Sequence, residues 1–288
     1  MTTERAYAKL NLSLDVLGKL PGGYHELCMV MESVDLCDEL EIFLRHDGEV
    51  RLETAISWLP RDKRNLAVAA VYAFREALGD ETLGADIRLK KRIPVGAGMA
   101  GGSTDGAAVL RGLNRLCGRP FDAGELRRIG LTLGSDVPYC VAGGSMLAGG
   151  RGEKLERLPM PPDCALVIAK PLFSLSTAEL FSRVDSRRAK TRPDTAGLIR
   201  AMEQQDAPGM ARRMFNVFED VLPRHCGEVA AIRGMLLEEG ALGAVMTGTG
   251  SAVFGVFVCG EEAERAARRL RKDYRDVFTA RFMKELEI

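Results

Sequence analysis

A glycine-rich segment in the first half of the chain constrains the fold more than any other feature. It runs Pro94-Val-Gly-Ala-Gly-Met-Ala-Gly-Gly-Ser-Thr-Asp105, between an alternating stretch at 87–91 that is typical of a strand and an apolar helical pattern at 107–116. Closely spaced glycines let backbone N–H groups approach an anion, and the first turn of a helix favours negative charge. The segment therefore predicts a phosphate-binding turn, followed by a helix that Ser103 or Thr104 caps. A tight glycine turn without a ligand is the alternative.

Two widespread nucleotide-binding motifs do not fit this segment. Gly96, Gly98 and Gly101 match the spacing GxGxxG, but a dinucleotide-binding fold needs a second buried strand and an acidic residue about 20 positions further on. The chain instead turns at 117–122, Cys-Gly-Arg-Pro-Phe-Asp. A P-loop needs a Gly-Lys-Ser/Thr sequence that is missing at this spacing. The predicted phosphate site therefore belongs to neither class.

Composition argues against several other classes of protein. The 288 residues carry 40 Lys and Arg against 40 Asp and Glu, and this balance argues against a nucleic-acid partner or a polybasic membrane binder. No apolar run reaches the roughly 18–20 residues that span a bilayer, and the first residues do not resemble a signal peptide, so we expect a cytoplasmic protein without a membrane partner. Seven cysteines without a CxxC pair and three histidines without HxxxH spacing favour no metal centre. Most of the cysteines are expected to be buried.

Strand and helix patterns alternate along the chain, which predicts an α/β or α+β fold. In the first half, strands are expected at 40–44, 50–52 and 87–91, with helices from Asn65, as the cap, to Gly79 and at 124–133. A proline-rich stretch at 155–163 marks the expected domain boundary. Beyond it we expect strands at 164–169 and 277–282, a strand–turn–strand unit at 241–258, and helices around 210–218, 228–239 and 261–272. This second half predicts an antiparallel sheet backed by helices.

Three further segments carry polar residues in suggestive positions. In the strand pattern Ala6–Leu14, alternation places Ala8, Leu10, Leu12 and Leu14 on one face and Lys9, Asn11 and Ser13 on the other. The sequence Gly134-Ser-Asp-Val-Pro138 places one carboxylate, Asp136, in a bend, and 245–252 is a second turn rich in glycine and hydroxyl groups. Alone, each segment has an ordinary structural explanation, such as a solvent-facing lysine or a turn aspartate.

Together and in this order, the segments resemble the galactokinase–homoserine kinase–mevalonate kinase–phosphomevalonate kinase superfamily. The opening AKLNLSLDVLGKLPGGYHEL (8–27) carries the most specific part of the resemblance, and 176–181 and 216–219 extend it over nearly the whole chain. It implies an α+β fold of two domains: residues 1–157, like the second domain of ribosomal protein S5, and residues 158–288, a ferredoxin-like α/β sandwich. The chain departs from the usual pattern at Met99-Ala100 and by threonine for serine at Thr247 and Thr249. These changes keep side-chain size or the hydroxyl group.

The resemblance implies phosphoryl transfer from ATP with Mg²⁺, for which we assign no protein ligand. Lys9 and Asp136 would be catalytic: Asp136 would take or orient the proton of the attacking hydroxyl, and Lys9 beside it would keep the carboxylate ionised and stabilise developing negative charge. Whether Asp136 is a true base or an orienting group stays open. The implied ATP-binding residues are Asn65, Pro94, Val95, Gly96, Ala97, Gly98, Met99, Ala100, Gly101, Gly102, Ser103 and Thr104.

Within the superfamily, the opening segment is most similar to members that phosphorylate the 2-hydroxyl of a methylerythritol linked to cytidine diphosphate, on the non-mevalonate route to isoprenoids. The implied substrate-binding residues are Asn11, Tyr24, His25, Phe181, Thr247 and Gly248, with Tyr24 and Phe181 as stacking surfaces. Two alternatives remain: a superfamily kinase for homoserine, mevalonate or a sugar, and a non-catalytic ATP-binding regulator. The sequence does not distinguish a monomer from a homodimer.

Overall fold

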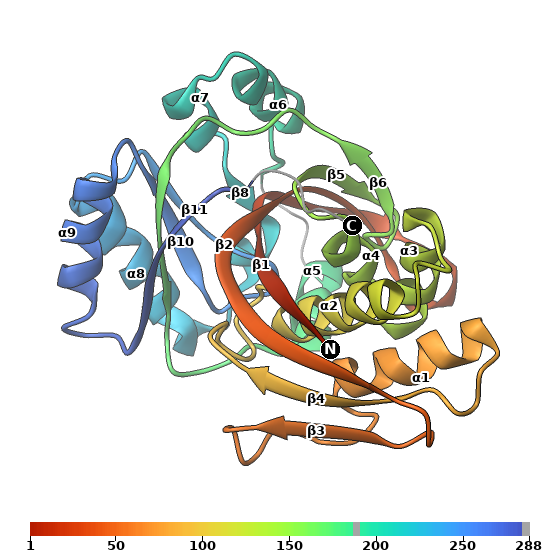
Figure 1. The fold of residues 1–288 in the computed structure, drawn as a ribbon. Coiled ribbons are helices and arrows are strands. Elements are labelled where there is room, and N and C mark those ends of the chain that lie inside the picture. The colour runs from red at the N-terminus through yellow and green to blue at the C-terminus, as the bar shows by residue number, and fades with distance from the viewer. Residues whose placement is uncertain (187–190, 284–288) are drawn as a thin grey trace.

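The computed structural model describes residues 1–186 and 191–283, and they build two antiparallel-rich sheets with helices packed around them (Figure 1). The first sheet has seven strands: β1 (Thr2–Lys19), β2 (His25–Arg45), β3 (Val50–Thr54), β4 (Gly84–Lys90), β5 (Ser145–Gly149), β6 (Lys154–Arg157) and β8 (Phe215–Asn216). The second has the order β11–β7–β10–β9, from β7 (Ala165–Lys170), β9 (Gly243–Met246), β10 (Val253–Phe257) and β11 (Asp276–Arg281). The fold is thus the expected mixed α+β arrangement.

The helices divide between the two sheets. With the first sheet lie α1 (Leu66–Leu78), α2 (Gly101–Leu116), α3 (Ala123–Leu133) and α4 (Val137–Ala142). The second half contains α5 (Thr177–Ser186), α6 (Thr195–Glu203), α7 (Ala207–Ala211), α8 (Gly227–Glu238) and α9 (Gly260–Leu270), besides short 3₁₀ turns that include Val217–Val221. No helix in the described ranges is long and apolar enough to cross a bilayer.

The long β1–β2 hairpin runs through the middle of the molecule, and both faces of β1 are covered (Figure 1). Leu10 and Leu12 pack in a cluster with residues of the second sheet, whereas Leu14 packs in the cluster beneath α1–α4. The expectation that Leu14 shares a face with Leu12 is therefore wrong. A register shift between Asn11 and Ser13 inserts one extra residue in β1, and such a bulge reverses the side-chain alternation beyond it.

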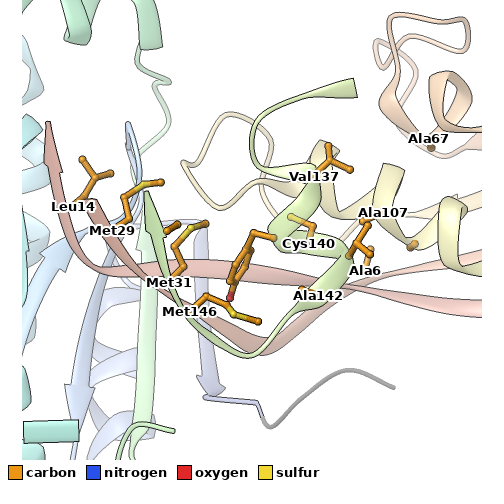
Figure 2. Close-up of a cluster of buried hydrophobic side chains, with 14 of the residues drawn as sticks. Ala6, Leu14, Met29, Met31, Ala67, Ala107, Val137, Cys140, Ala142 and Met146 are labelled. Carbon is orange, nitrogen blue, oxygen red and sulfur yellow. The ribbon is translucent and has the colours of Figure 1, made fainter. Parts of the chain in front are cut away.

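Side chains from neighbouring strands and helices fill the larger core. Figure 2 shows Leu14 beside Met29, and Met31 beside Met146, where β1, β2 and β5 pair, with Val137 and Cys140 of α4 nearby. Of the seven cysteines, Cys37, Cys140, Cys164 and Cys226 are buried as expected, Cys28 and Cys117 are partly buried, and Cys259 is exposed.

Local capping signals explain the helix boundaries, with one correction. The Asn65 side chain accepts a hydrogen bond from the Ala67 amide, and Gly79 ends α1 in a left-handed conformation, as predicted. By contrast, α2 begins at Gly101, so Ser103 and Thr104 lie inside its first turn and do not cap it. Ala100, at φ 55°, takes the capping position, and the turn before it delivers the helix start directly to the cavity described below.

The second half contains the expected antiparallel sheet, but the helix expected around 210–218 is wrong. The helix α7 stops at Ala211, and Phe215–Asn216 form a short strand that pairs in parallel with Ser13 and Leu14 of β1. A 3₁₀ turn follows at Val217–Val221. The strand β8 therefore joins the C-terminal half of the chain to the first sheet.

Candidate active site

One cavity of about 1050 Å³ brings together residues from both halves of the chain. Lys9 and Asp136 both border it, as do all of the residues expected to bind ATP except Thr104. Of the residues expected to bind the acceptor, Tyr24, His25, Phe181 and Gly248 line the cavity. Asn11 and Thr247 do not line it and are fully buried.

The glycine-rich turn forms one wall of the cavity and packs directly on the loop 247–250. A Cβ placed on Gly98 would lie 2.2 Å from the Thr247 carbonyl oxygen, and one on Gly248 would lie 2.5 Å from the Gly98 carbonyl oxygen. Both residues have positive φ, of 76° and 55°. Only glycine satisfies both the conformation and the close approach. The turn ends at the N-terminus of α2, where free backbone amides and the helix dipole favour an anion.

Thr104 does not line the cavity: its side chain is nearly buried, and its hydroxyl donates to the Gly101 carbonyl at 3.0 Å. Asn65 borders the cavity, but its side chain already caps α1 and donates to the Pro60 carbonyl at 3.0 Å. Helix capping thus accounts for Asn65, and its contact with the nucleotide stays a prediction.

Lys9 is a nearly buried cation, only 4% exposed, on the floor of the cavity. Its ammonium donates to the Asn11 Oδ1 atom at 2.6 Å, which confirms that the two side chains share a face of β1. The backbone amide of Asn11 donates to the Thr247 hydroxyl at 3.0 Å, which fixes Asn11 in place. The Asn11 Nδ2 group is buried without a hydrogen-bond partner among the described residues. Since a buried charge is costly unless it is paired, the Lys9 ammonium at the cavity is suited to an anionic, oxygen-rich ligand.

Asp136 precedes α4, and its carboxylate is half-buried and makes no capping hydrogen bond. A Cβ on Gly152 would lie 3.9 Å from the Asp136 Oδ1 atom, so the tight turn between β5 and β6 approaches this carboxylate. Asp136 and Lys9 border the same cavity, although the hydrogen bond of the Lys9 ammonium goes to Asn11. The carboxylate is therefore available to a hydroxyl group in the cavity.

Aromatic rings line the other end of the cavity. The His25 ring stacks on Phe181, with centroids 4.5 Å apart and an interplanar angle of 22°, and Phe218 meets Phe181 edge-on at 5.0 Å. The His25 Nε2–H donates to Asp185 at 2.8 Å. That hydrogen bond, together with one from Lys19, lowers the pKa of the Asp185 carboxyl. An aromatic surface with an oriented imidazole is suited to a planar base.

Tyr24 and Phe181 do not stack with each other: the Arg151 guanidinium lies 4.3 Å from the Tyr24 ring centroid, and Phe181 faces His25. Arg151 and Asp185 were missed by the sequence analysis. Arg151 stands in a third glycine-rich turn, Gly149-Gly-Arg-Gly152, which is a signal that could have been used. Asp185 is 160 positions from His25, and no local pattern connects them.

A buried charge cluster behind the turn was also missed. Lys91 pairs with Asp38 and, at 2.7 Å, with Asp105, and its ammonium also donates to the Gly101 carbonyl at 3.3 Å. Burial raises the pKa of the Asp105 carboxyl well above its ordinary range, despite the neighbouring ammonium. This cluster holds the first turn of α2 against β2 and β4.

Comparisons with known proteins show the family to which the chain belongs. Residues 65–144 match the GHMP kinases N terminal domain, and residues 198–276 match the GHMP kinases C terminal family. The chain is 43% identical over 282 residues to "4-diphosphocytidyl-2-C-methyl-D-erythritol kinase" of Exiguobacterium sibiricum, a match that covers 98% of each chain. It is also 43% identical to the protein of that name in Pelotomaculum thermopropionicum, over 97% of each chain.

Solved structures give the same result. A crystal structure of 4-(cytidine 5'-diphospho)-2C-methyl-D-erythritol kinase superposes with a TM-score of 0.83 at 30% identity, over 98% of this chain and 100% of that one. The homoserine kinase from Cytophaga hutchinsonii, at 19% identity and a TM-score of 0.73, shares the fold. The fold and the two family matches thus define a phosphotransferase of the GHMP class. Within that class, the chain belongs to the family of 4-diphosphocytidyl-2-C-methyl-D-erythritol kinases.

Proposed function

We propose that this protein transfers the γ-phosphoryl group of ATP to the 2-hydroxyl of 4-diphosphocytidyl-2-C-methyl-D-erythritol, on the non-mevalonate route to isoprenoids. The observation that carries the proposal is one cavity that is lined by the glycine-rich turn, Asp136 and the stacked His25 and Phe181 rings. A substrate with a base at one end and a hydroxyl at the other matches this order. The relatives that bear this name support the same substrate.

In the proposed reaction, the acceptor oxygen forms a bond to the γ-phosphorus and the bond to the β–γ bridging oxygen breaks, which releases ADP. Asp136 accepts the proton of the acceptor hydroxyl. Lys9 stabilises the negative charge on the transferring group, and Asn11, whose Oδ1 atom accepts from the Lys9 ammonium, orients Lys9. The backbone of the turn at 96–103 holds the ATP phosphates.

Magnesium enters this proposal with the nucleotide. Among residues 1–186 and 191–283, no three His, Cys, Asp or Glu side chains gather as a metal-binding group. A site without a protein cage fits Mg²⁺, which keeps several waters and binds through substrate phosphates with one or two protein oxygens. Ser103 borders the cavity, and its hydroxyl group would supply such an oxygen. The ion would neutralise charge on the phosphate oxygens.

The experiment that tests this function is ADP release from ATP and Mg²⁺ with a panel of acceptors. The panel contains 4-diphosphocytidyl-2-C-methyl-D-erythritol, methylerythritol 4-phosphate, mevalonate, homoserine and galactose. Turnover with the cytidylated acceptor alone supports the proposal. Turnover with a different acceptor would overturn the proposed substrate. ATP binding without turnover of any acceptor would favour a non-catalytic regulator.

The role of Asp136 is tested by Asp136→Asn, which keeps the size of the side chain and removes the proton acceptor. We expect kcat to fall by about 10²–10⁴-fold, the usual contribution of a general base, while ATP still binds. Asp122→Asn is the matched control, because Asp122 caps α3 outside the cavity and asparagine caps a helix equally well. Activity retained in Asp136→Asn would remove this residue from catalysis.

A further inference from the structure

The segment Asn216-Val-Phe-Glu219 lies between the two ends of the cavity, and no step proposed above uses it. Asn216 ends β8, which pairs with β1, and the following residues form the 3₁₀ turn Val217–Val221. Asn216 and Phe218 are both nearly inaccessible to solvent, at 3% and 1% exposure. Buried polar groups in such a position hold neighbouring backbone in place.

Asn216 fixes the loop that packs on the phosphate turn. Its Nδ2 group donates to the Met246 carbonyl at 2.7 Å and to the Gly248 carbonyl at 2.8 Å, so both of its N–H bonds are used. Its Oδ1 atom accepts from the Phe218 amide at 3.0 Å. Glu219 adds a second clamp, because its carboxylate accepts from the Met246 amide at 2.8 Å.

The loop held in this way reaches the reacting end of the cavity. A Cβ on Gly248 would lie 2.5 Å from the Gly98 carbonyl oxygen and 3.1 Å from the Lys9 Nζ atom. The hydroxyl of the preceding residue, Thr247, accepts a hydrogen bond from the backbone amide of Asn11. A shift of this loop would therefore move the phosphate turn, Lys9 and Asn11 together.

Phe218 supports the opposite end of the cavity. Its ring meets Phe181 edge-on at 5.0 Å and 84°, and Phe181 in turn carries the His25 stack. Removal of the Phe218 ring would leave a gap behind Phe181 and free that ring to change its orientation.

We infer that the segment 216–219 positions both ends of the substrate cavity, Asn216 through the loop 247–250 and Phe218 through Phe181. Both are positioning residues and neither is assigned a chemical step. The inference rests on the proposed function, since it takes Lys9 and the phosphate turn as the reacting end and the His25–Phe181 stack as the nucleoside end. Because the two residues stand only two positions apart, one rigid turn sets the distance between the two ends.

Two variants and two matched controls test the inference. Asn216→Ala and Phe218→Leu remove the two contacts separately. Asn114→Ala is the control for the first, because Asn114 is also buried and bonds to backbone, at 2.9 Å from the Phe121 carbonyl, outside the cavity. Phe74→Leu is the control for the second, because Phe74 is fully buried and meets Phe121 edge-on at 5.2 Å.

The two variants are expected to change different kinetic constants. Asn216→Ala should lower kcat by about 10- to 100-fold, the effect of a displacement near 1 Å at a reacting centre, and leave the Kd for CDP within about twofold. Phe218→Leu should raise the KM for the cytidylated acceptor and the Kd for CDP by about tenfold, and leave kcat within about threefold. The controls should lower the free energy of unfolding without these kinetic changes.

A merely structural segment would give a different result. If Asn216→Ala and Phe218→Leu lowered stability like their controls and changed all constants in parallel, or left them unchanged, the inference would be overturned. If Asn216→Ala does not fold, Asn216→Asp replaces it, because it keeps the acceptor for the Phe218 amide and loses both donors.

Failure of the proposed function would be visible in the wild-type protein, as absence of turnover with the cytidylated acceptor. The inference is then decided by binding of a non-hydrolysable ATP analogue and of CDP. Asn216→Ala must weaken the first and Phe218→Leu the second. Variants that bind both ligands like wild type, or a wild-type protein that binds neither, would contradict the inference.

Discussion

Gly98→Ala tests the contact between the glycine-rich turn, which is expected to bind the phosphates, and the loop 247–250. The added Cβ would lie 2.2 Å from the Thr247 carbonyl oxygen, about 1.2 Å short of the 3.4 Å at which ordinary contact begins. The second partner is also backbone, the Gly250 nitrogen at 2.8 Å, so no flexible side chain can move aside. The turn and the loop must therefore separate by about 1 Å, and a displacement of this size costs about 100-fold in kcat/KM.

A second glycine separates the effect of this contact from the effect of backbone conformation. Gly118 has φ 79°, nearly the same as the 76° of Gly98, but a Cβ placed on it would meet nothing within 4 Å. Alanine at either position carries the cost of a left-handed residue, about 1 kcal/mol. Gly118→Ala should therefore lose about that much stability and keep its kcat/KM, whereas Gly98→Ala should lose both.

The assay combines ADP release under kcat/KM conditions with urea unfolding followed by circular dichroism, for the wild type and both variants. The reasoning fails if Gly98→Ala keeps kcat/KM within about twofold of wild type while it loses no more stability than Gly118→Ala. That outcome would mean that the glycine-rich turn and the loop 247–250 can move apart without displacing the groups that are expected to react.

Two further predictions concern buried charge. Burial raises the pKa of the fully buried Glu32 carboxyl well above its ordinary value of 4.5. As the pH rises above that value the unfolded state ionises first, and stability falls by up to about 1.4 kcal/mol per pH unit until the folded state ionises as well. Glu32→Gln should flatten the pH dependence of urea unfolding above about pH 5, where the unfolded carboxyl is ionised. An unchanged slope, or the same change in the exposed control Glu203→Gln, would contradict this prediction. Lys91→Met leaves Asp38 and Asp105 buried without their cation and should lower the free energy of unfolding by about 3–5 kcal/mol. The control Lys90→Met removes an exposed lysine and should cost at most about 1 kcal/mol. Equal losses of stability in the two variants would argue against the buried cluster.

Features set by neighbours in the sequence could be predicted. The α1 helix was placed correctly because Asn65 and Gly79 are local capping signals, and the second sheet was recognised from its apolar strands and the turn at 247–251. The start of α2 was placed too late, because Ala100 adopts a left-handed conformation that no propensity predicts for alanine. The division into domains 1–157 and 158–288 stays a prediction.

Features set by distant contacts could not be predicted. The helix predicted at 210–218 does not form, because the side-chain Nδ2 group of Asn216 donates to the carbonyl oxygens of Met246 and Gly248, some 30 positions away. The same limit applies to Lys9: its burial follows from elements far away in the sequence that cover β1. The resemblance implies a catalytic role for Lys9, which stays a prediction, whereas the local pattern alone would have placed its side chain in solvent.

The position of β1 explains why both halves of the chain are needed for one site. Lys9 and Asn11 stand on a stretch of β1 between two register shifts, with Leu10 and Leu12 packed on the second sheet. The loop that holds the Asn11 amide belongs to the C-terminal half, whereas the Asp136 carboxylate and the phosphate turn belong to the N-terminal half. An isolated N-terminal half would expose Leu10 and Leu12 and lose the support of the phosphate turn. The groups that are expected to react therefore depend on the junction between the two sheets as much as on the turn that is expected to bind the phosphates.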